Sequence, residues 1–123
     1  MRMGSGDSFL SLERVGPDGP AIVWRISAAV AGAGCIAAVH GQAKVFAMDE
    51  TPAQLAGFTD HRVQRFELTL SEGGWLRIKR VPSGRTLVRY RVGQWKAGMA
   101  LEGEVRLEGE AAEAFCREIG SLL

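Results

Sequence analysis

The stretch RFELTLSEGGWLRIKRV, from Arg65 to Val81, decides the fold class. In its first half, apolar and polar side chains alternate strictly, and the apolar positions are Phe66, Leu68 and Leu70. An alternation of period two is typical of a strand with one buried and one solvated face. Gly73 and Gly74 then supply a turn, and the alternation resumes at Trp75. The stretch therefore predicts an antiparallel hairpin.

The same pattern extends in both directions along the chain. A turn at Pro82–Gly84 leads into RTLVRYRV, and a turn at Gly93–Gln94 leads towards MALEGEVRLEG, where apolar and charged positions alternate. Upstream, GPDGP at Gly16–Pro20 separates an apolar run beginning at Phe9 from AIVWRISAAV, and another extended segment is expected over Cys35–Met48. Short turns of this kind join antiparallel strands. We therefore expect about seven strands.

Two helices complete the prediction. In MDETPAQLAGF, Asp49 or Thr51 suits the N-cap and Gly57 suits a stop, which predicts a short helix over Pro52–Ala56. The C-terminal GEAAEAFCREIGSLL has an apolar stripe at helical spacing, formed by Ala111, Ala112, Phe115, Ile119 and Leu122. The predicted fold class is α+β, an antiparallel meander sheet with the C-terminal amphipathic helix packed on its apolar face.

Length and charge limit the function classes. The 123 residues suit one domain over residues 9–123, with MRMGSGDS, residues 1–8, as a flexible lead-in. The net charge of +1 argues against a nucleic-acid-binding domain, which usually carries a clear basic excess. The uncharged run between Arg25 and Lys44 loses its apolar character near Val39, so it is too short to span a membrane. Without a secretory signal pattern, a cytoplasmic location is expected.

The run VAGAGCIAAVHG imitates the glycine-rich turn of dinucleotide-binding proteins, with GxGxxA at Gly32, Gly34 and Ala37. In that motif a helix must follow and cross back over a parallel sheet, so that its first N–H groups meet the pyrophosphate. Only Cys35–Ala43 precedes the next apolar segment, KVFAM, which is shorter than the crossover of about a dozen residues that parallel pairing needs. We therefore expect a glycine-permitted bend between antiparallel strands, and no cofactor.

No pattern typical of an enzyme is found in the sequence. Cys35 and Cys116 lack the CxxC spacing and the histidine set of a zinc site, so no metal is expected. Two buried free thiols are favoured over a disulfide between them. His40, in an expected strand, and His61, in an expected loop, have no recognisable spacing to a nucleophile. We expect a chain without catalytic activity.

The strongest compositional feature is WLRIKRVPSGRTLVRYRVGQWK, from Trp75 to Lys96, which has no acidic residue. Its seven basic residues are Arg77, Lys79, Arg80, Arg85, Arg89, Arg91 and Lys96. Alternation places four of them on one outward face, namely Arg77, Lys79, Arg89 and Arg91, with Trp75 and Trp95 at the ends. This face is the candidate binding site, and an acidic protein surface is the partner that suits it best.

The other interpretation of this face is purely structural. The next predicted strand presents Glu102, Glu104 and Glu108, and neighbouring antiparallel strands bring opposite charges into contact. Consecutive strands are usually neighbours in space. A solvated face crossed by ion pairs is therefore the favoured interpretation, with the binding face as its alternative.

The later part of the chain resembles the WapI-like immunity proteins, a family of small bacterial proteins. The order KVFAMDETPAQLAGF, then RFELTLSEGGWLRIKRV, then LEGEVRLEGEAAEAFCREIGSLL carries this resemblance, over Val45–Leu123. It implies an α+β domain that binds and neutralises a partner protein in the bacterial cytoplasm.

Two other ligand classes stay open. Strands followed by one C-terminal helix also resemble the pleckstrin-homology layout, which implies binding of a phosphorylated lipid headgroup. A small-molecule carrier with a pocket between sheet and helix is the further alternative. A homodimer through an exposed strand edge at Phe9–Val15 is also expected as a possible assembly.

Overall fold

The computed structural model describes residues 1–46, 51–94 and 98–123 of the chain. These residues form one antiparallel sheet in which the order of the strands in space is their order in the sequence. The strands are β1 (Arg2–Ser5), β2 (Ser8–Asp18), β3 (Ala21–Gly32), β4 (Cys35–Phe46), β5 (Arg65–Leu70), β6 (Trp75–Arg80), β7 (Thr86–Gln94) and β8 (Met99–Leu107). The helices are α1 (Thr51–Thr59) and α2 (Gly109–Ile119). The predicted α+β meander is confirmed, with eight strands in place of about seven.

The additional strand is β1, so the prediction of a flexible lead-in over residues 1–8 is wrong. Met3 lies opposite Leu10 in β2 and is only 5% exposed. A tight turn with Gly6 in the left-handed region, φ +60°, joins the two strands. The composition of MRMGSGDS is that of a loop, and one buried methionine is too little to show a periodicity.

The same strand corrects the expected position of the open edge. Phe9 and Ser11 pair with β1 on one side and with β3 on the other, and the Leu12 N–H donates to the Met1 carbonyl at 2.8 Å. Most of the edge expected at Phe9–Val15 is therefore already covered. The first and last strands of the sheet, β1 and β8, also contact each other, but no strand ladder joins their described residues.

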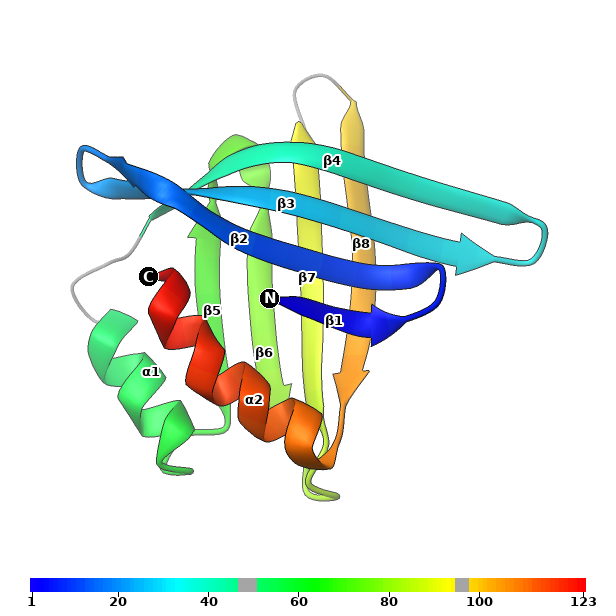
Figure 1. Cartoon of the computed structure of the whole chain (residues 1–123). Helices are drawn as coiled ribbons and strands as arrows, with labels where there is room; N and C mark the ends of the chain where they lie inside the picture. Colours follow the sequence, from blue (N-terminus) through cyan, green and yellow to red (C-terminus); the bar gives the residue numbers. More distant parts are fainter. Residues whose placement is uncertain (47–50, 95–97) are drawn as a thin grey trace.

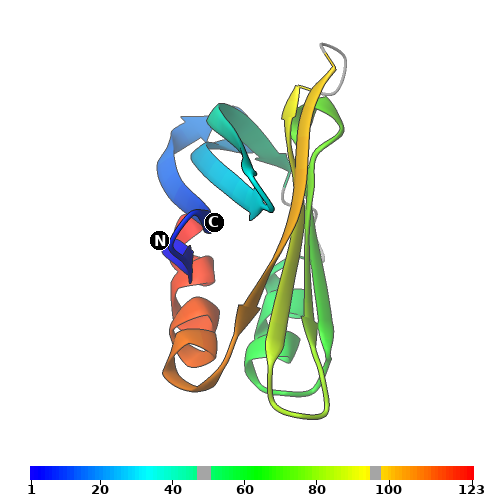
Figure 2. The ribbon, with the colours of Figure 1, turned by 90° about the vertical axis from the view of Figure 1, so that its right-hand side faces the viewer.

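The sheet is folded into two layers. Strands β1–β4 cross in front of β5–β8 in Figure 1, and α2 lies on the same side as the first four strands. The side view in Figure 2 shows β1–β4 and α2 together as one layer, with β5–β8 as the other. The bend lies between β4 and β5, whose described residues pair only at Val45–Leu70 and Phe46–Thr69. Both layers turn their apolar faces inward, as in orthogonally packed sheets.

The interior between the layers is filled by large side chains. Trp24 of β3 is fully buried, and its Nε1–H donates to the Leu122 carbonyl at 2.8 Å. Phe115 and Ile119 of α2 are buried in the same core, as the helical spacing predicts, whereas Ala111 of the expected stripe is exposed. Burying such side chains contributes about 1.5–3 kcal/mol each. The Trp24 hydrogen bond fixes the end of the C-terminal segment on the first layer.

Helix α1 is longer than the predicted Pro52–Ala56. Gly57, expected as a stop, is buried inside the helix, where an added Cβ would come within 3.2 Å of the Val63 side chain. The helix continues so that Phe58, which is fully buried, reaches the core. Thr51 is its first residue, and the alternative N-cap, Asp49, lies outside the described residues.

The glycine motif forms the predicted bend. Gly32 pairs with Cys35 across a two-residue turn that contains Gly34 in the left-handed region, φ +74°. The strands on either side are antiparallel. Both cysteines have free thiols, but the expectation that both are buried is wrong, because Cys35 is exposed beside the turn and Cys116 is half-buried.

The close packing at Gly103, in strand β8, leads to a prediction about stability. An alanine Cβ at Gly103 of β8 would overlap the hydroxyl of Tyr90, which lies opposite it on β7 and is buried. We expect Gly103→Ala to lower the free energy of unfolding by about 1–3 kcal/mol, measured by urea denaturation. Gly41→Ala in β4 is the control, because no atom lies within 4 Å of its added Cβ. Equal stability of the two variants would contradict this packing.

Tyr90 also makes a prediction about pH. Burial raises the pKa of its phenol above the ordinary value of 10.0. Because the folded-state pKa is the higher one, the contribution of this group to stability is complete below pH about 10 and is lost as the pH rises through the folded-state pKa. Tyr90 is the one tyrosine in the sequence, so the ultraviolet absorbance of tyrosinate reports on it alone. The midpoint should fall when the titration is repeated in denaturant, and an unchanged midpoint would show that the phenol is already solvated.

Candidate functional site

The candidate site is the outer face of β5–β8, on the opposite side from α2. The strand register arranges its side chains in three rows that run across the four strands. The first row is Arg65, Lys79, Leu87 and Arg106, the second is Glu67, Arg77, Arg89 and Glu104, and the third is Thr69, Trp75, Arg91 and Glu102. We call this surface the cationic face, since its six basic residues exceed its three carboxylates.

In the second row, the carboxylates at the two ends neutralise the two arginines between them. Arg77 Nε lies 3.4 Å from Glu67 Oε1, and Arg89 Nε lies 3.9 Å from Glu104 Oε2. Three of the four side chains are more than half exposed and Glu104 is 34% exposed, so each pair contributes between about 0 and 1 kcal/mol to stability. These pairs add little to stability, but they remove the net charge of the second row, because each carboxylate cancels the charge of one arginine beside it.

The third row is neutralised at β8. The Arg91 Nε–H donates to Glu102 Oε1 at 2.6 Å. The predicted ion pairs of Glu102 and Glu104 with the basic hairpin are therefore confirmed. The expectation for Glu108 is wrong in its position, because this residue follows β8 and pairs with Arg85 at 2.6 Å, beyond the three rows.

The first row has no carboxylate. Arg65 of β5 lies directly opposite Lys79 of β6, and the structure records no ion pair for either side chain within its described part. Arg106 at the other end pairs with Glu104 of its own strand at 3.1 Å. The excess positive charge of the cationic face is therefore concentrated at Arg65 and Lys79, at the end nearer α1. Sequence alternation places Arg65 on this face, but the hairpin register is what brings it beside Lys79.

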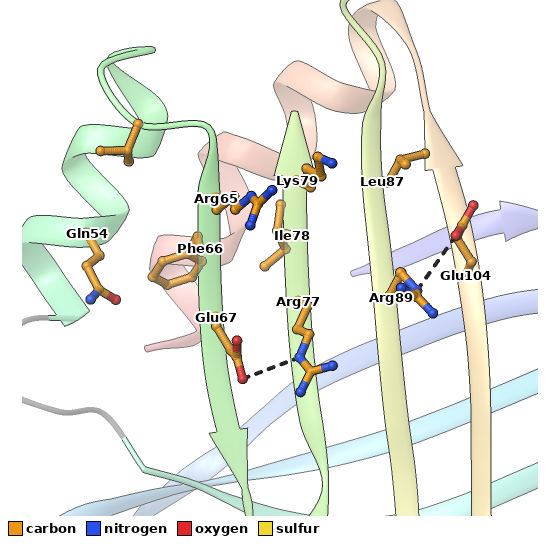
Figure 3. Close-up of a pocket in the computed structure, with 11 residues that line it drawn as sticks. Gln54, Arg65, Phe66, Glu67, Arg77, Ile78, Lys79, Leu87, Arg89 and Glu104 are labelled. Atoms are coloured by element: carbon orange, nitrogen blue, oxygen red, sulfur yellow. Dashed lines mark ion pairs between the residues drawn. The ribbon is translucent and has the colours of Figure 1, made fainter. Parts of the chain in front are cut away.

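An open groove of about 790 Å³ lies over this end of the face. Figure 3 shows Arg65 and Lys79 on neighbouring strands, with Gln54 on α1 beside β5 and the second-row ion pairs in the row next to them. The apolar side chain of Leu87 forms part of the surface. Guanidinium and ammonium groups donate charge-assisted hydrogen bonds, and a guanidinium can hold a carboxylate by two parallel bonds. The groove therefore suits an anionic ligand.

The Trp75 ring, at the edge of the cationic face, is contacted by two arginines of the same face. The Arg77 guanidinium carbon lies 4.0 Å from the centroid of the Trp75 ring, and that of Arg91 lies 5.8 Å away. These cation–π contacts hold both arginines over the ring. Trp75 thus positions cations and does not present a bare surface for stacking. The other predicted tryptophan, Trp95, lies outside the described residues.

Arg80 belongs to the basic hairpin but does not lie on the cationic face. Its Nη2–H donates to the Phe58 carbonyl at 2.9 Å, and its guanidinium lies 4.2 Å from the Phe58 ring. Cys116 of α2 is 3.9 Å from the same nitrogen. Burial raises the pKa of the Cys116 thiol, and the Arg80 charge only partly offsets this effect. Arg80 therefore connects β6 to both helices, and Cys116 stays a protonated thiol beside it.

The two histidines lie apart from the cationic face. His40 Nδ1 and Ser27 Oγ form an exposed hydrogen bond of 2.6 Å across β3 and β4. His61 follows α1 with φ 62°. Among the described residues, no three His, Cys, Asp or Glu side chains are grouped so that they could hold a metal ion. No helix in the described part of the chain has the length and apolar character needed to cross a membrane.

Comparison with protein-family models, with curated protein sequences and with solved structures finds no match. The resemblance to the WapI-like immunity proteins therefore stays a prediction.

Proposed function

We propose that this chain is a non-catalytic protein-interaction module that binds an acidic surface of a partner protein through its cationic face. The observation that carries the proposal is the first row, where Arg65 and Lys79 lie side by side without a carboxylate opposite them. In the second row, by contrast, each arginine is paired with a carboxylate. An immunity-like role, in which the partner is neutralised by this binding, is the specific form that the resemblance implies.

The shape of the face favours a protein over a single small anion. Its cations are spread over four strands, and neighbouring strands lie about 4.8 Å apart. Carboxylates repeated along a helix or strand of a partner match such a spacing, whereas one phosphate reaches only the nearest cations. The interior offers little support for a carrier, because the space between the layers holds Trp24, Tyr90 and Phe115.

Electrostatics would act mainly on recognition. Exposed charges accelerate association and disfavour wrong partners more than they add affinity, and salt screens them. The exposed carboxylates of Glu67, Glu102 and Glu104 would repel an acidic partner from the second and third rows. This arrangement directs the acidic partner to the end of the face beside α1.

The first test removes the charge of the first row. A fluorescent peptide rich in Asp and Glu should bind the wild type at low salt, measured by anisotropy, and the Arg65→Glu, Lys79→Glu variant should lose this binding. The control is Arg14→Glu, Arg117→Glu, which makes the same change in net charge at two exposed positions off the face. Equal weakening in both variants would mean that only net charge matters. Preference of the wild type for anionic lipid vesicles or inorganic phosphate over the peptide would support the headgroup alternative instead.

The second test strengthens the same face. Glu104→Gln removes the carboxylate that pairs with Arg89 and Arg106, so we expect tighter binding of the acidic peptide. The free energy of unfolding should change by no more than about 1 kcal/mol, because both pairs are exposed. Glu13→Gln, which removes an exposed ion pair with Arg25 in the first layer, is the matched control and should leave the affinity unchanged. Weaker binding in Glu104→Gln would contradict the proposal.

A further inference from the structure

Strand β4 has a long open edge. It pairs with β3 from Cys35, opposite Gly32, to Val45, opposite Ile22. On its other side, the described residues of β4 pair with β5 only at Val45 and Phe46. Within the part of the chain that the structure describes, the residues from Cys35 to Ala43 therefore have a neighbouring strand on one side only. In Figure 1 the β3–β4 hairpin extends past β8, where this edge is accessible.

One hydrogen bond shows which backbone groups point out of this edge. The Lys44 N–H donates to Ser71 Oγ at 2.9 Å, so it points away from β3. Along an antiparallel strand, alternate residues direct both N–H and C=O to the same neighbour. Ile36, Ala38, His40 and Gln42 therefore direct their N–H and C=O groups outward from the edge.

This edge lacks the features that usually prevent strands from pairing between molecules. Natural sheets protect edges by short strands, charged residues, proline or a covering element. The edge at β1 has only four residues, and β8 carries Glu102, Glu104 and Arg106 and lies against β1. By contrast, residues 26–43, which include the open part of β4, contain no charged residue and no proline.

We propose that two copies of this chain pair antiparallel through β4, across a two-fold axis at Val39. This register places Ile36 opposite Gln42 and Ala38 opposite His40, and then repeats both pairs by symmetry. All four outward residues of each chain are used, which gives about eight intermolecular hydrogen bonds. Shifting the axis to Ala38 or His40 loses one outward residue from each chain. No charged side chain faces another in the Val39 register, so a self-complementary contact forms without repulsion.

The surroundings of the edge suit a paired strand. A small groove beside β4 is lined by Val39, Gly41, Val92, Gly93 and Met99. Met99 is 62% exposed, and Ile36 on the edge itself is 59% exposed. A strand added to β4 would cover part of this apolar surface as well as the open backbone groups. The contact is one strand pair wide, so we expect a dimer whose population rises with protein concentration.

The proposal is tested by placing a charge on the edge. Sedimentation velocity of the wild type should show a monomer that converts to a dimer as the concentration rises. Ala38→Lys should remain monomeric over the same range, because its side chains would lie next to the two-fold axis. The matched control is Ala53→Lys on the exposed surface of α1, which should dimerise like the wild type. Circular dichroism verifies that both variants are folded.

A crosslink tests the register without relying on a loss of assembly. In the Val39 register the two Val39 residues form a non-hydrogen-bonded pair with Cα atoms about 4.5 Å apart, which a disulfide can bridge. Val39→Cys in a Cys35→Ser background should form a covalent dimer under mild oxidation, and Gly32→Cys in the same background should not.

Three results would overturn the proposal: a wild type that stays monomeric at its highest soluble concentration, dimers that persist in Ala38→Lys, or no crosslink at position 39. A wild type that stays monomeric would mean that the β4 edge does not pair with a second copy, and a strand of another protein would then be the next partner to test. The dimer uses no residue of the cationic face, so the Arg65→Glu, Lys79→Glu variant should still dimerise, and the failure of either proposal can be recognised separately.

Discussion

The two residue pairs that join β4 to β5 are the constraint on which the rest of the structure depends. Among the described residues, Val45–Leu70 and Phe46–Thr69 are the only ladder contacts between the halves of the sheet. So short a ladder leaves the halves free to cross, and burial of apolar surface then brings them together with α2. Val45, which pairs with Leu70 at the bend, is fully buried, so the bend is part of the core.

The short pairing of β4 with β5 also creates both of the surfaces to which we assign interactions. Because β5–β8 turn one face towards β1–β4 and α2, their other face is left for solvent and carries the charges. Because β4 pairs with β5 only at its last two residues, the described part of β4 that precedes them keeps an unpaired edge. One surface is strongly charged and the other carries no charge, so they suit partners of different chemistry. An acidic partner and a second copy would not compete for the same residues.

The cationic face shows how a nearly neutral chain can hold a local excess of charge. Its cross-strand neighbours decide the outcome row by row. Arg77 and Arg89 lie opposite each other, and each has a carboxylate beside it. Arg65 and Lys79 also lie opposite each other, but in a row that has no carboxylate. Like charges opposite each other on a strand pair are destabilising by a few tenths of a kcal/mol. Such a pair is therefore a feature that stability alone does not favour, which is the physical reason for assigning it to binding.

The sequence by itself determined the strands from Phe66 onward, the glycine-permitted bend at Gly32 and Gly34, and the amphipathic C-terminal helix, because each depends on a local period or a local backbone requirement. It also predicted that Glu102 and Glu104 neutralise part of the basic hairpin, since consecutive strands pair. It did not show β1, whose four residues are too few for a periodicity to be read.

Only the tertiary structure decided the rest. The bend at Val45, the position of Arg65 beside Lys79 and the open edge of β4 all depend on how far each ladder runs and where it stops. The overlap that forbids a side chain at Gly103 depends on the Tyr90 ring from the next strand. These are contacts between residues distant in the chain, and a local alternation of side chains carries no information about the length or register of such a pairing.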